Sequence, residues 1–110
     1  MTGKYAKPDC PSTARLNLFD NYMSRYKQSL AQVAVKEYCD IADKYNLTPT
    51  ELSLIWCYNQ KHVASTIIGA TNMNQLKENM NSYFKLNQLS NDLVNDINNV
   101  YKRFRDPARI

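Results

Sequence analysis

The sequence predicts a mainly α-helical chain with about four helices and at most one short strand. After residue 28, apolar residues recur at the helical spacings of three and four over most of the chain. The 110 residues include only two glycines, Gly3 and Gly69, so few tight hairpins are expected. Residues 63–68 form a single β-branched run, and no second run of similar quality is present to pair with it.

Length and composition favour one small globular unit, residues 1–110. Hydrophobic residues make up 44% of the chain, which is typical of a folded protein and not of a disordered one. No apolar run approaches the about 20 residues that span a bilayer. Residues 1–5 also lack the apolar stretch of a signal peptide. We therefore expect a cytoplasmic protein without a membrane partner.

The residue types that bind metals are scarce. Cys10, Cys39 and Cys57 are widely spaced, which favours reduced thiols over disulfides or a zinc site, and His62 is the only histidine. The net charge of +4 is concentrated at the two ends of the chain. Basic ends can attract phosphate, nucleic acid or acidic lipid, but they are more often simply solvated. Because no nucleic-acid-binding motif is present, we expect neither a metal nor a nucleic-acid partner.

The chain divides into an irregular region, residues 1–27, and a helical region, residues 28–110. Pro8 and Pro11 interrupt helix in the first region, although residues 16–26 could form a short helix. Residues 29–46 carry an apolar stripe typical of an amphipathic helix. The stripe consists of Leu30, Val33, Ala34, Ile41, Ala42 and Tyr45.

The next helix begins at a recognisable capping motif. Thr48 can cap it, Pro49 suits the first helical position, and Glu51 completes a capping box. Its apolar residues cover a wide surface, which indicates burial on more than one side. The broad face of Leu52, Ile55 and Trp56 is a candidate surface for self-association. The surface contains Leu52, Leu54, Ile55, Trp56 and Tyr58.

Residues 63–68 are predicted to form a buried strand that ends at Gly69. A single buried strand leaves backbone groups without partners, so the chain is expected either to be incomplete or to pair with another copy. A helix follows over residues 72–84, with an apolar stripe of Met73, Leu76, Met80 and Tyr83. The last helix starts after Ser90, and its apolar face contains Leu93, Ile97, Val100, Tyr101 and Phe104.

The passage from residue 67 to 79 is the best candidate for binding chemistry. A helix start presents free N–H groups and partial positive charge, which suit phosphate, and Gly69 lets backbone approach a ligand. Gln75 and Asn79 share one helix face with Glu78 beside them, and these groups suit an adenine amino group or ribose hydroxyls. An ordinary capped helix is the alternative interpretation of the same residues.

The segment IIGATNMNQLKEN, residues 67–79, resembles the last strand and helix of the aldo-keto reductases. The similarity is greatest to the branch of the Tas-like reductases and potassium-channel β subunits. LTPTELSLIWCYNQKHVASTIIGAT, residues 47–71, resembles the family's helix, strand and glycine turn in order and spacing. MTGKY, residues 1–5, resembles a loop of the same family, so the resemblance covers essentially the whole chain.

The resemblance implies the C-terminal portion of a (β/α)8 TIM barrel, with an NADP(H) site at the carboxyl ends of the strands. By this resemblance, Gly3 and Lys4 match the family's loop over the cofactor pyrophosphate. Arg15 resembles an arginine that lies near the adenosine phosphate. The family's positions that hold the adenosine end of NADP(H) are matched here by Gly69, Thr71, Gln75, Glu78 and Asn79.

The family's catalytic Asp, Tyr, Lys and His have no matching motif in this chain, so no catalytic residue is expected. His62 precedes the strand, which places it at the opposite end of a barrel from the chemistry. We therefore expect the truncated C-terminal part of an NADP-dependent carbonyl reductase, inactive alone and with weak or no cofactor binding. The alternative is a non-catalytic interaction or self-association module, built on an exposed strand and helix faces.

Overall fold

The computed structural model describes residues 2–109, and Met1 and Ile110 lie outside this part. The N-terminal region contains only short turns of helix: η1 (Lys4–Ala6), α1 (Arg15–Leu18) and η2 (Ser24–Lys27). Longer helices follow: α2 (Ser29–Lys44), α3 (Pro49–Tyr58), α4 (Met73–Ser82) and α5 (Asn91–Arg103), with η3 (Tyr83–Gln88) before the last. The predicted mainly α fold with four principal helices is confirmed.

The helix starts follow their local sequence. The Thr48 hydroxyl accepts a hydrogen bond from the Glu51 N–H, and the Glu51 side chain accepts one from the Thr48 N–H, so the predicted capping box is present. The Ser90 side chain accepts from the Leu93 N–H at the start of α5, as predicted. These side chains satisfy backbone donors that the first turn of each helix leaves free.

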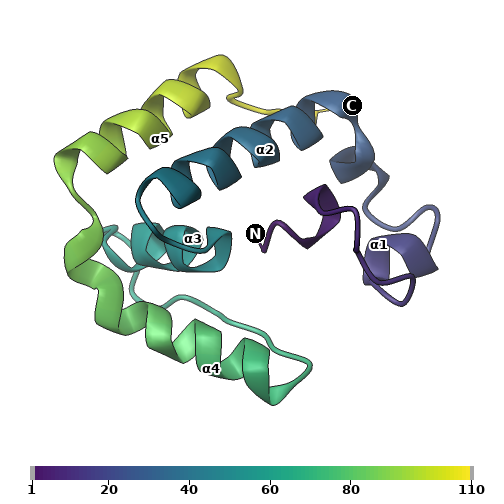
Figure 1. The fold of residues 1–110 in the computed structure, drawn as a ribbon. Helices are drawn as coiled ribbons and strands as arrows, with labels where there is room; N and C mark the ends of the chain where they lie inside the picture. The colour runs from purple at the N-terminus through teal and green to yellow at the C-terminus, as the bar shows by residue number, and fades with distance from the viewer. Residues whose placement is uncertain (1, 110) are drawn as a thin grey trace.

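One hydrophobic core joins α2, α3 and α5. Figure 1 shows α5 running alongside α2, while α4 lies on the other side of α3. Ile55 and Leu93 are completely buried, so α3 and α5 both contribute central side chains. None of the described helices is long and apolar enough to cross a membrane. The buried cluster consists of Ile41, Ala42, Leu47, Leu52, Ile55, Leu93, Ile97 and Val100.

The strand predicted at residues 63–68 does not form, and the segment is irregular. A strand is stabilised by a neighbouring strand, and residues 2–109 supply none. The segment is also more exposed than predicted, since 97% of Ile67 is accessible to solvent. The Thr66 hydroxyl oxygen is buried without a hydrogen-bond partner.

Several predicted apolar stripes are only partly buried. On α2, Leu30 and Val33 are exposed, while the smaller Ala31 and Ala34 pack inward. On α4 and η3 the expected stripe lies mostly in solvent, and Asn79 and Ser82 are buried instead; its exposed members are Met73, Met80 and Tyr83. The apolar periodicity predicted where the helices lie, but it did not predict which of their side chains neighbouring elements bury.

The wide apolar surface of α3 is mostly internal. Leu52 and Ile55 are buried in the core, so the expectation that they form an exposed association face is wrong. Trp56 is 39% exposed. The two sides of α3 are covered by α2 and by α4 with η3, which explains why its sequence is apolar around most of the helix.

Candidate functional site

The turn before α4 is built from hydrogen bonds between polar side chains and backbone. The Asn72 side chain caps α4 by accepting from the Gln75 N–H at 2.9 Å. The Gln75 side-chain oxygen in turn accepts from the Thr71 N–H at 2.8 Å and from the Thr71 hydroxyl at 3.0 Å. One amide oxygen therefore receives two donors where the chain enters the helix.

Asn79 ties the same turn to the body of α4. Its Nδ2 donates to the Gly69 carbonyl at 2.9 Å, and only 8% of Asn79 is exposed. The structure thus brings together four of the residues singled out from the sequence: Gly69, Thr71, Gln75 and Asn79.

Gly69 has no conformational or packing reason to be a glycine. Its φ lies outside the left-handed region, and a Cβ built at Gly69 would meet no heavy atom within 4 Å. The fold therefore leaves open space beside this backbone, directly before a capped helix start.

Glu78 is connected to α3 and not to the turn. Its Oε1 accepts a hydrogen bond from the Thr48 hydroxyl at 2.8 Å. The Glu51 Oε2 accepts from the Thr48 N–H at 2.9 Å, and the Glu51 Oε1 pairs with the Lys85 Nζ at 2.7 Å. Glu78 thus belongs to a polar network that joins the start of α3 to α4 and η3.

Gly3 packs at the same end of α3. Its φ of +69° lies in the left-handed region, where a side chain is disfavoured. An added Cβ would lie 3.0 Å from the Cys39 Sγ and 3.2 Å from the Pro49 Cγ. Partial burial also raises the pKa of the Cys39 thiol, chiefly by desolvation. Steric and conformational demands are sufficient to explain this glycine.

Lys4 and Arg15 each lie beside a tyrosine ring, and within residues 2–109 no recorded hydrogen bond or ion pair joins them to the turn at Gly69. The Lys4 Nζ lies 5.1 Å from the ring centroid of Tyr5. The Arg15 guanidinium lies 5.8 Å from the ring centroid of Tyr22. Figure 1 shows α1, which begins at Arg15, well separated from α4.

Thr48 is the functional candidate that sequence reasoning missed. Its role as a helix cap follows from four consecutive residues, but its contact with Glu78 joins positions 30 residues apart. No local pattern contains such a pairing. Asn72, by contrast, caps α4 by accepting from Gln75 only three residues later, so its pairing is local.

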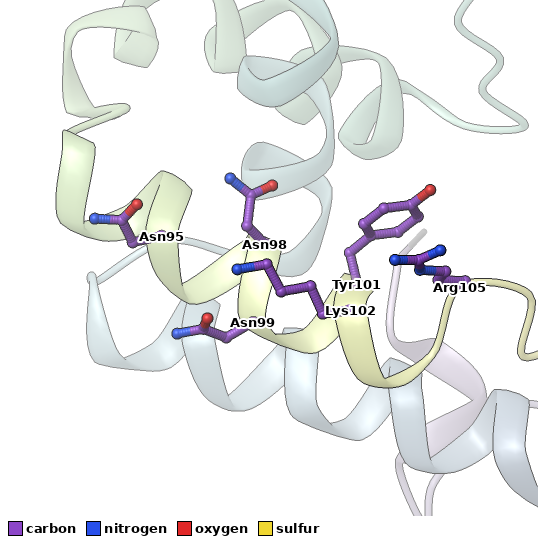
Figure 2. A pocket seen from close by; sticks show the side chains of 6 residues that line it. All are labelled: Asn95, Asn98, Asn99, Tyr101, Lys102 and Arg105. Atoms are coloured by element: carbon purple, nitrogen blue, oxygen red, sulfur yellow. The ribbon is translucent and has the colours of Figure 1, made fainter.

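A separate shallow hollow lies on the outer face of α5. Figure 2 shows its lining side chains on α5 and, for Arg105, on the chain just after it, with Lys102 extending back toward Asn98. Within residues 2–109 the structure records no hydrogen bond or ion pair for these side chains, and none belongs to the polar groups around α4. The lining consists of Asn95, Asn98, Asn99, Tyr101, Lys102 and Arg105.

The opposite side of α5 is held to α2 by ion pairs. The Lys44 Nζ lies 2.7 Å from the Asp96 Oδ2, and the Tyr45 hydroxyl donates to the same oxygen at 2.9 Å. The Lys44 hydrogen bond, followed by that from Tyr45, lowers the pKa of Asp96. Arg103 forms a two-pronged ion pair with Glu37. These charges serve to dock one helix on another.

Sequence comparisons place the chain in a known family. The family model described as "Aldo/keto reductase family" matches residues 2–102. The chain is 39% identical over 112 residues to an "Aldo-keto reductase" of Babesia bovis, which covers 100% of this chain and 39% of the relative. It is 39% identical over 108 residues to "Protein tas" of Escherichia coli (strain K12), which covers 98% of the chain and 30% of the relative.

A plant protein is also similar. A "Probable voltage-gated potassium channel subunit beta" of Oryza sativa subsp. japonica is 32% identical over 103 residues, covering 91% of this chain and 31% of the relative.

This chain belongs to the aldo/keto reductase family. Its mainly α fold is the fold of a portion of that family's (β/α)8 barrel. The chain spans between about a third and two fifths of the length of these relatives.

Proposed function

We propose that this chain is the C-terminal part of an NADP-dependent aldo-keto reductase and contributes the adenosine-phosphate side of the cofactor site. Proteins of this family generally use NAD(P)H. The observation that carries the proposal is Gly69, a glycine that the fold does not require and that faces open space before the capped start of α4. A ligand that approaches the backbone closely would explain why a side chain is absent there.

The polar groups around Gly69 have the chemistry that the adenosine end of NADP(H) needs. Thr71 carries an N–H and a hydroxyl at the start of α4, where the helix favours phosphate oxygens. Both now donate to the Gln75 side-chain oxygen, so a phosphate oxygen would take the place of that acceptor. Gln75 and Asn79 offer amides, and Glu78 offers a carboxylate that can accept from amino or hydroxyl donors. When bound in a complete reductase, NADPH supplies the hydride that reduces a carbonyl group.

Residues of the N-terminal region would complete the proposed site. Gly3 and Lys4 would form the loop over the pyrophosphate, and Arg15 would lie near the adenosine phosphate. Arg15 would have to move toward α4, because its guanidinium now lies against Tyr22. The chain supplies no match to the family's catalytic Asp, Tyr, Lys and His, so we propose no catalytic step by its own residues.

Substituting Gly69 with alanine tests the proposal. Gly69→Ala meets no neighbouring atom in this structure, so the fold should persist while NADPH affinity falls. Ser65→Thr is the matched control, because it also adds one methyl group to the exposed segment before α4. Affinities would be measured by protein-detected NMR titration with NADPH. Equal affinities for Gly69→Ala and the wild type would contradict a ligand at this backbone.

A self-association or interaction module is the second candidate. The observation that favours it is exposed apolar surface, since Ile67 is 97%, Phe84 80% and Met73 74% accessible. Residues 64–68 form no strand in this structure, which leaves their backbone groups free to pair with an added strand. Light scattering across a dilution series would decide: a strict monomer at high concentration argues against this candidate.

A further inference from the structure

The Thr48 hydroxyl is shared between two helices. Its oxygen accepts from the Glu51 N–H at 3.1 Å and so caps α3. The same hydroxyl donates to the Glu78 Oε1 at 2.8 Å, in the middle of α4. A hydroxyl carries one hydrogen and two lone pairs, so both bonds can form at once. The capping bond therefore fixes the position of the Thr48 Oγ1, which is the atom that donates to Glu78.

The surrounding network prevents Thr48 from turning away. Its own N–H donates to the Glu51 Oε2 at 2.9 Å, which locks the backbone at this position. The other oxygen of Glu51 pairs with Lys85 of η3, and only 9% of the Glu51 side chain is exposed. Glu51 is therefore a nearly buried carboxylate with both oxygens engaged, and it anchors Thr48 from one side while Glu78 lies on the other.

We propose that Thr48 is a positioning residue that holds the Glu78 carboxylate in the orientation needed to accept from the adenosine end of the cofactor. This inference rests on the proposed function, in which Glu78 is a cofactor contact. The Thr48 bond engages Oε1, and the described residues make no recorded hydrogen bond to Oε2, so one oxygen remains available. A free glutamate samples several rotamers, and binding must then freeze them. Thr48 restricts this freedom before the cofactor arrives.

Two substitutions at position 48 separate this role from helix capping. Thr48→Gly removes the hydroxyl, yet glycine is about as good an N-cap as threonine, so the start of α3 should persist. The variant also loses the bond to Glu78, so its midpoint of unfolding should fall no further than that of Glu78→Ala, which loses the same bond. Thr48→Ser keeps both the cap and the donor. We expect Thr48→Ser to bind NADPH like the wild type. Thr48→Gly should bind about 2- to 10-fold more weakly, because one side chain must now be immobilised on binding.

A double substitution identifies the route of the effect. On a Glu78→Ala background, Thr48→Gly should cause no further loss of NADPH affinity, since the residue that it positions is already absent. If Thr48 had a purely structural role, Thr48→Gly would lower NADPH affinity by the same factor with and without Glu78. It would also lower thermal stability by the same amount on the two backgrounds. NADPH affinity would be measured by NMR titration, and stability by thermal unfolding of the same samples.

The outcomes are distinct. Wild-type affinity in Thr48→Gly, or the same fold loss with and without Glu78, would overturn the positioning role while leaving the proposed cofactor site intact. If the wild-type chain itself does not bind NADPH, the proposed function fails, and the positioning role fails with it. Nonadditive losses of NADPH affinity, together with a midpoint of unfolding in Thr48→Gly no lower than in Glu78→Ala, are the result that we expect.

Discussion

The two glycines of the chain should respond in opposite ways to alanine. Gly3 has a φ of +69°, and an added Cβ would approach the Cys39 Sγ to 3.0 Å. Gly69 has neither a left-handed φ nor any heavy atom within 4 Å of an added Cβ. The same chemical change, one methyl group, is therefore crowded and strained at one position and unhindered at the other.

The cost at Gly3 can be worked from these two features. A left-handed conformation costs a non-glycine residue about 1–2 kcal/mol. Crowding against Cys39 and Pro49 adds a further penalty, since the Pro49 ring is rigid and the Cys39 thiol is partly buried. Overpacking of this kind typically costs about 1–3 kcal/mol. We expect Gly3→Ala to lose about 2–5 kcal/mol of the free energy that docks the N-terminal segment. Gly69→Ala should be neutral or gain up to about 1 kcal/mol by restricting the unfolded chain.

Urea denaturation followed by Trp56 fluorescence would compare the two variants with the wild type. The N-terminal segment could also detach locally, so NMR shifts of Cys39 and its neighbours on α2 should be recorded as well. Gly3→Ala should lower the midpoint or shift these signals toward solvent-exposed values. If Gly3→Ala matches the wild type in both measurements, or Gly69→Ala is the more damaging change, the account of the two glycines is wrong.

Three further predictions concern charges and activity. Asp96→Asn should lower the free energy of unfolding at pH values above the unfolded aspartate pKa of about 3.9. Because Lys44 and Tyr45 lower the folded pKa, this advantage of the wild type should disappear as the pH falls through that lower value, as followed by thermal unfolding from pH 7 to 2. Lys85→Ala should cost about 1–2 kcal/mol, since it leaves the nearly buried Glu51 carboxylate without its cation; an unchanged urea midpoint would contradict this. The chain alone should not oxidise NADPH in the presence of a test aldehyde, and turnover by a homogeneous preparation would refute the claim that it lacks catalytic groups.

The sequence correctly predicted those features that depend on interactions between residues close together in the chain. Thr48, Pro49 and Glu51 predicted the start of α3, and Ser90 predicted the start of α5, because each cap involves residues within one helical turn. The order of helices followed from apolar periodicity for the same reason. The hydrogen bond from Asn79 to the Gly69 carbonyl also brings together two residues of one predicted strand–turn–helix passage.

The missed features depend on distant neighbours. β-Branched residues at 63–68 favour a strand only when another strand is beside them, and the described chain provides none. Periodicity on α4 selected the stripe containing Met73 and Met80, but contact with α3 and the preceding loop buried Asn79 and Ser82 instead. The Thr48 bond to Glu78 likewise joins two helices, so no sequence pattern could reveal it.

The most direct test of the proposed function is an NMR titration of the wild-type chain with NADPH, using assigned backbone amide signals. Saturable shifts should concentrate in residues 69–79 and at Thr48, and they should be absent from the outer face of α5 around Lys102 and Arg105. The absence of shifts in residues 69–79 at millimolar NADPH would contradict the claim that this chain carries the adenosine side of a cofactor site.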